Sequence, residues 1–371
     1  MSYAAEIARS IMRYEPADRP ALRTFQRDHF GAVSRHCDDE FFEWLFERNP
    51  HRDPAGASLW LCKRDGAVVA QQASIPTLLK IGDSEHRAAW LIDWMVHPEW
   101  RLKGVSPALF AANANSTDIM LGLGLEEIAY RSVRRAGWHD AGRLTLFVRP
   151  LDGAASAKIL NLPPLLGKLA PRFIVGGSAR FIAGVGGAMA RVSLEPVSAF
   201  DERIDALWDT VSREHEVVAK RDFEIVRWRF DEGPHRVLYD RYYLTRKGVV
   251  VGYAVLRITD WRGHRIGRVV DYFTARQWVA PLLALVMGEL DRKGVVAVFL
   301  EQWDARAEKT LRSLGCIRAR PSHRFMFKAR ETVLAGAADS LAHASNWFIT
   351  PADSDFDHIL IGPHGDGAAA P

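Results

Sequence analysis

A nine-residue pattern occurs twice in the chain and constrains the fold more than any other feature. Residues 44–52 and residues 228–236 both read Trp-x-Phe-x-x-x-Pro-His-Arg. The segments after the two patterns also come in the same order: a hairpin signal, a long apolar segment, a helical stretch, a short strand, a second helical stretch and a last strand. Self-similarity of this length predicts two copies of one structural unit.

Matching segments of the two copies predict the same elements. Asp65-Gly66 and Lys247-Gly248 each lie between two apolar runs, which is typical of a β-hairpin with a tight turn. A long apolar segment follows each hairpin, and antiparallel strands therefore precede a β-α-β crossover. We expect an α/β (α+β) fold in which each copy is a mixed, mostly antiparallel sheet flanked by helices.

The repeat divides the chain into four parts. We expect the first copy to occupy residues 1–150 and the second copy to occupy residues 201–330. Each copy is expected to close on a last strand of its own, at 144–150 and at 324–330. The parts outside the copies are a connection rich in Gly and Pro at 151–200 and a tail at 331–371.

Composition excludes several classes of protein. Of the 371 residues, 48% are apolar and 25% are charged, which is ordinary for a soluble globular chain and excludes disorder along its whole length. Three scattered cysteines without a close pair argue against a disulfide framework or a zinc site. The N-terminus lacks the apolar core of a secretory signal, and 173–190 is too rich in Gly for a membrane span, so we expect a cytoplasmic protein.

The tail carries Asp353-x-Asp355-x-Asp357, which has the spacing of the start of a calcium loop. The Gly at the sixth loop position and the Glu at the twelfth are missing. We therefore expect no metal, and a solvated acidic tail that ends in a low-complexity segment.

The two copies differ most at the junction between the long strand and the next helix. If Pro107 and Pro281 correspond, the second copy lacks four residues there. A helix N-terminus presents unpaired N–H groups and a partial positive charge, so it attracts an anion. Ser106 suits the N-cap position and Pro107 the first helical position, while Gly104 lets a ligand approach the backbone. The alternative is an ordinary turn with two solvated basic residues.

This junction resembles a known cofactor loop. The run Arg101-x-x-Gly104-x-Ser106 after Val96-His97-Pro98 resembles the acyl-CoA pyrophosphate loop of the GNAT superfamily of N-acyltransferases. The resemblance implies two tandem GNAT-like domains, of which only the first binds acetyl-CoA. It also implies direct attack of a small primary amine on the thioester. The groups implied to hold the cofactor are the strand end Met95, Val96 and His97 and the loop residues Arg101, Leu102, Lys103, Gly104, Val105 and Ser106.

The catalytic residues follow less directly from the resemblance. Many relatives carry a Tyr acid four residues before a Gly, and here that position is Val133. Tyr130 lies one helical turn earlier and is a candidate substitute, although a packed helix tyrosine is the alternative. Glu127 and His97 are candidates for proton transfer because their counterparts in the second copy are alanines. Asp93 matches Asp271, so a structural role common to both copies is favoured.

Other functions remain open. A protein that keeps the fold and binds CoA without catalysis is one, since the usual Tyr is missing. A Fem-type aminoacyl transferase acting on cell-envelope precursors is another, although the intact loop and the lack of a basic stripe argue against it and against nucleic acid. Basic residues among apolar ones in 156–191 suggest a weak membrane-surface contact, packing against both copies, or a fold over the acceptor site. We do not expect this segment to form one regular helix. His51 and Arg52 are candidates to line an acceptor cleft between the copies.

Overall fold

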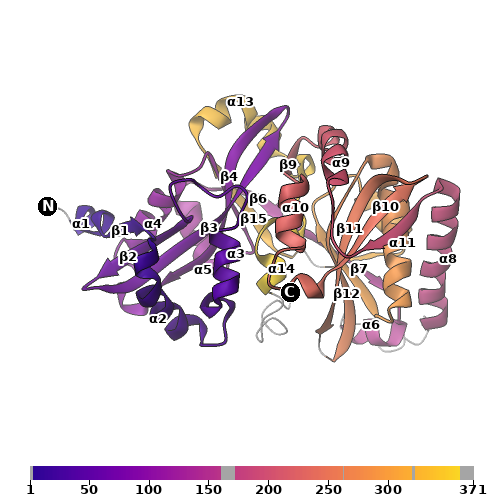
Figure 1. Ribbon diagram of the computed structural model, residues 1–371, viewed down its shortest axis with the longest axis horizontal. Helices are drawn as coiled ribbons and strands as arrows, with labels where there is room; N and C mark the ends of the chain where they lie inside the picture. The colour runs from indigo at the N-terminus through magenta and orange to yellow at the C-terminus, as the bar shows by residue number, and fades with distance from the viewer. Residues whose placement is uncertain (1–2, 160–171, 262, 320–321, 360–371) are drawn as a thin grey trace.

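The computed structural model describes residues 3–159, 172–261, 263–319 and 322–359. Two sheets lie side by side, and each is covered by helices (Figure 1). The first copy supplies α1 Tyr3–Arg9, β1 Ile11–Arg13, α2 Arg19–Phe30, α3 Asp39–Phe46, β2 Leu59–Arg64, β3 Ala67–Ile81, β4 Ser84–Val96, α4 Val105–Ala114, β5 Ile119–Leu123, α5 Glu127–Arg135, β6 His139–Arg143 and β7 Thr145–Pro150.

The later parts of the chain complete the two sheets. The connection contains α6 Gly153–Ile159, α8 Arg172–Ala190 and β8 Ser193–Val197. The second copy contains α9 Arg203–Val211, β9 Val217–Ala219, α10 Phe223–Phe230, β10 Asp240–Arg246, β11 Val249–Trp261, β12 His264–Thr274, α11 Arg276–Arg292, β13 Ala297–Gln302, α12 Glu308–Ser313, β14 Ile317–Arg318 and β15 Arg324–Ala329. The tail contains α13 Glu331–Ala342, β16 Trp347–Phe348 and α14 Phe356–Ile359.

The predicted fold class is confirmed. The first sheet has the strand order β1-β2-β3-β4-β5-β15-β6, with β9 added beside β3, and the second has the order β14-β7-β13-β12-β11-β10-β8. Most neighbours are antiparallel, while β4 with β5 and β12 with β13 form the parallel crossovers. Both predicted hairpins form, because Asp65-Gly66 and Lys247-Gly248 adopt the left-handed backbone that such a turn requires.

The last strands of the two copies are exchanged. The first copy's β7 pairs with β13 of the second sheet, placing Phe147 opposite Leu300. The second copy's β15 pairs with β5 of the first sheet, placing Phe327 opposite Leu121. The expectation that each copy closes on its own last strand is therefore wrong. An apolar strand pattern specifies a strand but not the sheet that receives it, and the two copies offer nearly equivalent edges.

The repeated pattern forms the centre of the molecule. The rings of Trp44 on α3 and Trp228 on α10 stack with centroids 4.8 Å apart. Each indole N–H donates to the backbone carbonyl of the other tryptophan, at 2.8 and 2.9 Å. Both side chains are buried, so these bonds satisfy the two indoles inside the core. The reciprocal pairing relates the two copies by an approximate two-fold axis.

The described part of the connection contains two separate helices, α6 and α8, and not one regular helix. Residues 172–190 form one helix, α8, which packs along α11. A Cβ atom on Gly288 would lie 2.6 Å from the Cβ of Ala183, so small residues let the two helices approach closely. Of the glycines of this helix, Gly186 and Gly187 face α11, whereas a Cβ on Gly177 or Gly184 would meet no atom within 4 Å. Residues 160–171 lie outside the described residues. Among the helices that the structure describes, none combines the length and apolar character needed to cross a bilayer.

A buried histidine predicts a loss of stability in mild acid. Burial lowers the pKa of His215 well below its ordinary value, and the ring lies against Phe273 and Phe348. The native state keeps the His215 ring neutral, while the same ring in the unfolded chain becomes protonated below a pH of about 6.5. The contribution of His215 to the free energy of unfolding is therefore complete above that pH and is lost as the pH falls.

We expect the free energy of unfolding of the His215→Phe variant to fall less between pH 7 and pH 5.5 than that of the parent. The difference in slope should approach about 1.4 kcal/mol per pH unit for one buried histidine. Urea unfolding at the two pH values measures it. His343→Phe makes the same change at an exposed residue and is the control. Equal slopes for His215→Phe and the parent would contradict the assignment.

Candidate active site

The loop between β4 and α4 turns on two residues with left-handed backbone. Leu102 has a φ of 61° and Gly104 a φ of 81°. Gly104 is the N-cap of α4, so the prediction that Ser106 caps the helix and Pro107 opens it is wrong by two residues. Glycine adopts the left-handed conformation at no steric cost, and proline fits anywhere in a first turn whose N–H groups are unpaired. A Cβ on Gly104 would meet no atom within 4 Å, so this side of the loop is open.

The loop gathers positive charge around the start of α4. The first N–H groups of the helix, including that of Ser106, have no intrahelical partner and carry the positive end of the helix dipole. The Arg101 Nε donates to the Val96 carbonyl at 3.2 Å, which holds this guanidinium beside the loop. The Lys103 ammonium lies 5.1 Å from the centre of the Trp100 ring. The arrangement is suited to a polyanion such as a pyrophosphate.

The matching place in the second copy is occupied by the chain itself. Ala275 alone separates β12 from α11, whereas residues 97–104 separate β4 from α4. The Glu214 carboxylate accepts a hydrogen bond from the Arg276 N–H at the start of α11, at 2.6 Å. It also contacts the guanidinium of Arg306 at 3.3 Å. An internal carboxylate therefore takes the position that an external anion would take in the first copy.

Strands β4 and β5 separate beside the loop and leave one edge of β4 unpaired, where an extended ligand could lie. β4 pairs with β5 only over Ala88–Trp90 and then continues to Val96. Its other edge remains paired with β3, where Gln71 lies opposite Met95. The β5-facing edge of β4 thus presents backbone groups near its end, where Met95, Val96 and His97 were predicted to hold the pantetheine arm.

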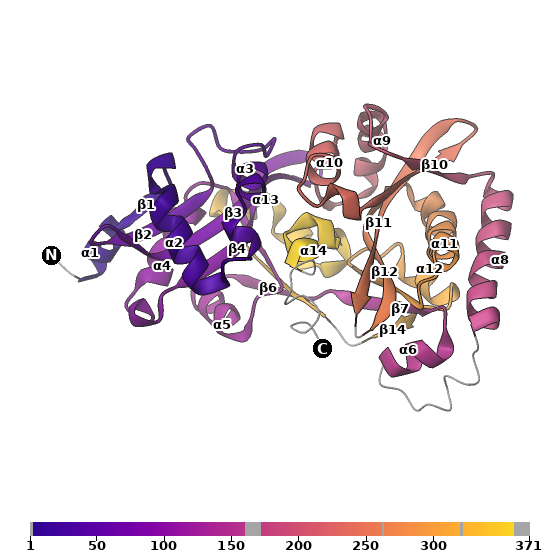
Figure 2. The same cartoon turned by 60° about the horizontal axis from the view of Figure 1, so that its bottom comes forward.

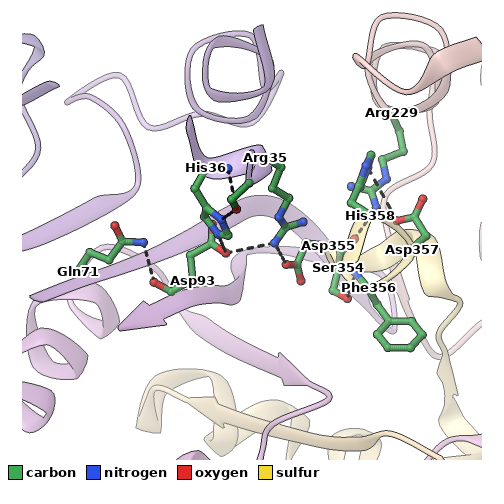
Figure 3. Close-up of polar contacts among 11 residues, drawn as sticks. Arg35, His36, Gln71, Asp93, Arg229, Ser354, Asp355, Phe356, Asp357 and His358 are labelled. Atoms are coloured by element: carbon green, nitrogen blue, oxygen red, sulfur yellow. Dashed lines mark hydrogen bonds and ion pairs between the residues drawn. The ribbon is translucent and has the colours of Figure 1, made fainter. Parts of the chain in front are cut away.

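A polar cluster lies around Asp93, at a bulge of β4 where its pairing with β3 shifts in register (Figure 3). The bulge lies in the part of β4 that is no longer paired with β5. Asp93 has a φ of 48°, and its carboxylate binds the Arg35 guanidinium at 3.1 Å and the His36 Nε2 at 2.8 Å. The His36 Nδ1 lies 2.7 Å from the Ser34 hydroxyl. Burial by itself would raise the pKa of Asp93, but the charges of His36 and Arg35 outweigh it and lower the pKa. The cluster therefore holds an ionised carboxylate against an imidazole.

The predicted catalytic residues are held by separate contacts. The Tyr130 hydroxyl donates to Asp140 at 3.2 Å, which places it toward β6 rather than β4. Glu127 is exposed on α5 and pairs with Arg131 on the same helix. His97 follows β4 directly, and its ring lies 5.5 Å from that of His29. No contact among the described residues joins Tyr130, Glu127 and His97, and their catalytic roles stay predictions.

The acidic segment 353–357 of the tail is part of the interior, and the expectation that it is solvated is wrong. The low-complexity end, 360–371, lies outside the described residues. α14 lies between the two halves of the molecule in both views (Figures 1 and 2). Each tail aspartate pairs with a different arginine: Asp353 with Arg221 at 2.7 Å, Asp355 with Arg35 at 2.5 Å, and Asp357 with Arg229. Composition gave no signal for this pairing, because the partners are far apart in sequence. Among the described residues, no group of three or more potential ligands is arranged to hold a metal.

The tail also connects the polar cluster to the second copy. Arg35 lies between Asp93 and Asp355, while Arg221 lies between Asp271 and Asp353. Burial raises the pKa of Asp355, and the negative charge of Asp93 adds to the rise against the attraction of Arg35. The matching aspartates of the two copies are thus both bridged to the tail by an arginine. The tail residues and Arg35 were missed by sequence reasoning.

His51 and Arg52 do not lie in a cleft between the copies. They line a cavity formed by first-copy residues alone. A pocket of about 40 Å³ does lie between the copies, bordered by Arg221, Asp271 and Asp353. It is smaller than the first-copy cavity of about 180 Å³. The cavity that His51 and Arg52 line is therefore not a cleft between the copies, although, besides burial, the charges of Asp222 and Lys220 in the second copy act on the pKa of His51.

Comparison with solved structures identifies the fold. A GCN5-related N-acetyltransferase from Anabaena variabilis aligns with a TM-score of 0.59 at 15% identity, covering 86% of this chain and 72% of that chain. One from Kribbella flavida aligns with a TM-score of 0.58 at 14% identity, covering 88% and 72%. The N-myristoyltransferase of Saccharomyces cerevisiae with bound myristoyl-CoA gives 0.50 at 13% identity, covering 78% and 70%.

At these identities the likeness shows a shared fold. No family model and no curated protein matches the chain by sequence. The GNAT fold that the loop resemblance predicted is confirmed.

Proposed function

We propose that the protein is an acyl-CoA-dependent N-acyltransferase that moves an acetyl group to a small primary amine. The observation that carries the proposal is the contrast between the two helix N-termini. In the first copy the start of α4 is open behind Gly104, whereas in the second copy the start of α11 is bound to Glu214. The proposal explains this difference: the first copy binds acyl-CoA at its open helix N-terminus, while the second copy fills the matching position with its own Glu214.

The first copy supplies the parts that the reaction requires. The N–H groups from Arg101 to Ser106 would hold the pyrophosphate, and the helix dipole would offset its charge. The free edge of β4 at Met95 and Val96 would align the pantetheine arm as an added strand. The amine then attacks the thioester carbonyl directly, and the CoA thiolate leaves. No covalent intermediate on the protein is needed.

Proton transfer has two sets of candidates. His97 follows the strand end where the thioester is expected, and Glu127 and Tyr130 lie on α5. The geometry adds His36, because the Asp93 carboxylate fixes one ring nitrogen and the bulge lies two residues before Met95. A carboxylate-bound imidazole is a common general base. Its other ring nitrogen lies 2.7 Å from the Ser34 hydroxyl, so it would take the proton of the attacking amine through that hydroxyl.

A thiol-release assay with acetyl-CoA and a panel of amines tests the function. We expect turnover with at least one of the sugar amines, amino acids or polyamines tested. His36→Gln and His97→Gln, together with Glu127→Gln and Tyr130→Phe, should each be compared with the parent. Replacing a residue that transfers a proton should lower kcat by about 10²–10⁴-fold and change the affinity for acetyl-CoA little. Silence across the whole panel, with acetyl-CoA still bound, would contradict catalysis.

One observation favours the non-catalytic alternative. Val133 stands where many relatives carry the Tyr acid, and it is fully buried in the core. A protein that binds acyl-CoA without transferring the acyl group would need no such acid. Retained acetyl-CoA binding with no thiol release distinguishes this alternative from the enzyme.

Location and surface contacts are part of the proposal. The cysteines Cys37, Cys62 and Cys316 are free thiols, which fits the cytoplasm that we propose. On α8 the apolar side chains Phe181 and Met189 are exposed by 71% and 82%, and both lie on one face with Val185. Such a stripe supports the weak membrane-surface contact predicted for 156–191.

A further inference from the structure

A cavity of about 180 Å³ opens on the first copy, away from the loop. Its walls come from the segment after α3, from β3, from the start of β4 and from the turn before β5. Ala88 and Ala89 of β4 also border the cavity. The cavity is several times larger than the pocket of about 40 Å³ between the copies.

Polar groups with unused hydrogen-bonding capacity line this cavity. The His51 Nε2 is buried and has no hydrogen-bond partner among the described residues. A buried polar atom without a partner is costly, and a rotation of the ring that opened this atom to the cavity would let a ligand pair with it. Burial lowers the pKa of His51, so the ring is neutral at physiological pH and can donate or accept one hydrogen bond. Ser58 and Thr77 add hydroxyl groups.

Two guanidinium groups give the cavity its charge. Arg52 is exposed at the cavity, and no contact of its side chain is found in the part of the chain that the structure describes. The Arg87 guanidinium lies 3.5 Å from the Asp53 carboxylate. That carboxylate has a closer partner in the Arg13 guanidinium, at 2.9 Å. Arg52 and Arg87 therefore outnumber the single carboxylate, and that carboxylate is already paired. A forked guanidinium pairs best with a carboxylate or a phosphate.

The second copy provides an internal comparison. His235 and Arg236 occupy the same positions of the repeated pattern as His51 and Arg52. The His235 ring packs against Phe41 and His358. Arg236 contacts the carboxylate of Glu40. The residues of the second copy are thus used in internal contacts, whereas Arg52 of the first copy is exposed at the cavity.

We propose that this cavity binds a small anion, carrying a carboxylate or a phosphate, between Arg52, Arg87 and His51. The site is separate from acyl transfer: Ala89 and Met95 are six residues apart on β4, which places the cavity about 20 Å from the expected thioester. A ligand of this size cannot reach the reacting atoms from there, so it acts as an effector or a stabilising ligand rather than as the acceptor.

Isothermal titration calorimetry with inorganic phosphate and with succinate, in a chloride buffer, tests the proposal on the full chain. We expect saturable binding of at least one probe. Arg52→Ala should weaken it at least tenfold, and Arg87→Ala should also weaken it. Arg236→Ala, the matched change in the second copy, should leave it within twofold. Binding of phosphate alone or of succinate alone identifies the ligand chemistry.

The Gly104→Glu variant separates this site from the cofactor loop. Phosphate could also bind at the start of α4, so binding must persist in this variant to support the cavity. Hydrogen exchange should show added protection in residues 51–58 when the probe is present. The proposal would be overturned if neither probe binds, or if Arg52→Ala and Arg236→Ala weaken binding equally. It would also be overturned if Gly104→Glu loses probe binding while Arg52→Ala and Arg87→Ala keep it. None of these readouts depends on acyl transfer.

Discussion

Replacing Gly104 by glutamate is expected to abolish binding of acetyl-CoA. The new side chain would extend into the open space where the pyrophosphate is expected, and its charge would repel that anion. The left-handed φ of 81° adds backbone strain. We expect the affinity to fall by more than about 100-fold, which corresponds to about 2.7 kcal/mol of binding free energy. Calorimetric titration of acetyl-CoA measures the change.

Gly248→Glu is the matched control for this prediction. Gly248 has a φ of 79°, and a Cβ there would also meet no atom within 4 Å. The two variants should therefore lose similar stability, about 1 kcal/mol each. Only Gly104→Glu should lose acetyl-CoA. Equal affinity in the two variants would show that the loop between β4 and α4 is not the cofactor site.

Replacing Asp357 by alanine is expected to destabilise the whole molecule. Its carboxylate binds the Arg229 guanidinium and accepts a hydrogen bond from the Tyr239 hydroxyl, and all three side chains are buried. Burial would raise the pKa of Asp357, but the Arg229 charge outweighs it and lowers the pKa to about 2. Removing the carboxylate leaves Arg229 as a buried unpaired charge, which costs about 3–5 kcal/mol. Urea unfolding measures the loss.

Two further variants show whether the lost charge pair is the cause. Glu308→Ala breaks an exposed pair with Arg312, at 2.6 Å, and should cost about 1 kcal/mol or less. The double variant Arg229→Met with Asp357→Leu removes both buried charges and should recover much of the stability. An Asp357→Ala protein as stable as Glu308→Ala would mean that the tail does not hold the two copies together.

Much of the fold could be predicted because its determinants are local. Asp65-Gly66 and Lys247-Gly248 specify hairpins through their own backbone preferences. Alternation of apolar residues specifies the strands, and the extra residues after Val96 mark the junction at which the copies differ most. These signals lie within a few positions of the elements that they determine.

The candidate site could be predicted only in part. Arg101 to Ser106 are continuous in sequence, so their loop was recognisable. The cluster around Asp93 was not, because Asp355 reaches Arg35 across 320 positions. No spacing rule indicates which arginine a tail aspartate will meet, and the same acidic run in a solvated tail would look identical.

The sequence by itself indicated two copies of one unit and predicted that only the first copy carries an anion-binding loop. Only the tertiary structure decided which sheet each last strand joins and where the tail lies. The physical reason is that β7 and β15 carry the same apolar pattern and fit either sheet edge. The selection between such equivalent arrangements depends on long-range packing, in which Trp44 stacks on Trp228 and three arginines bind the aspartates of the tail.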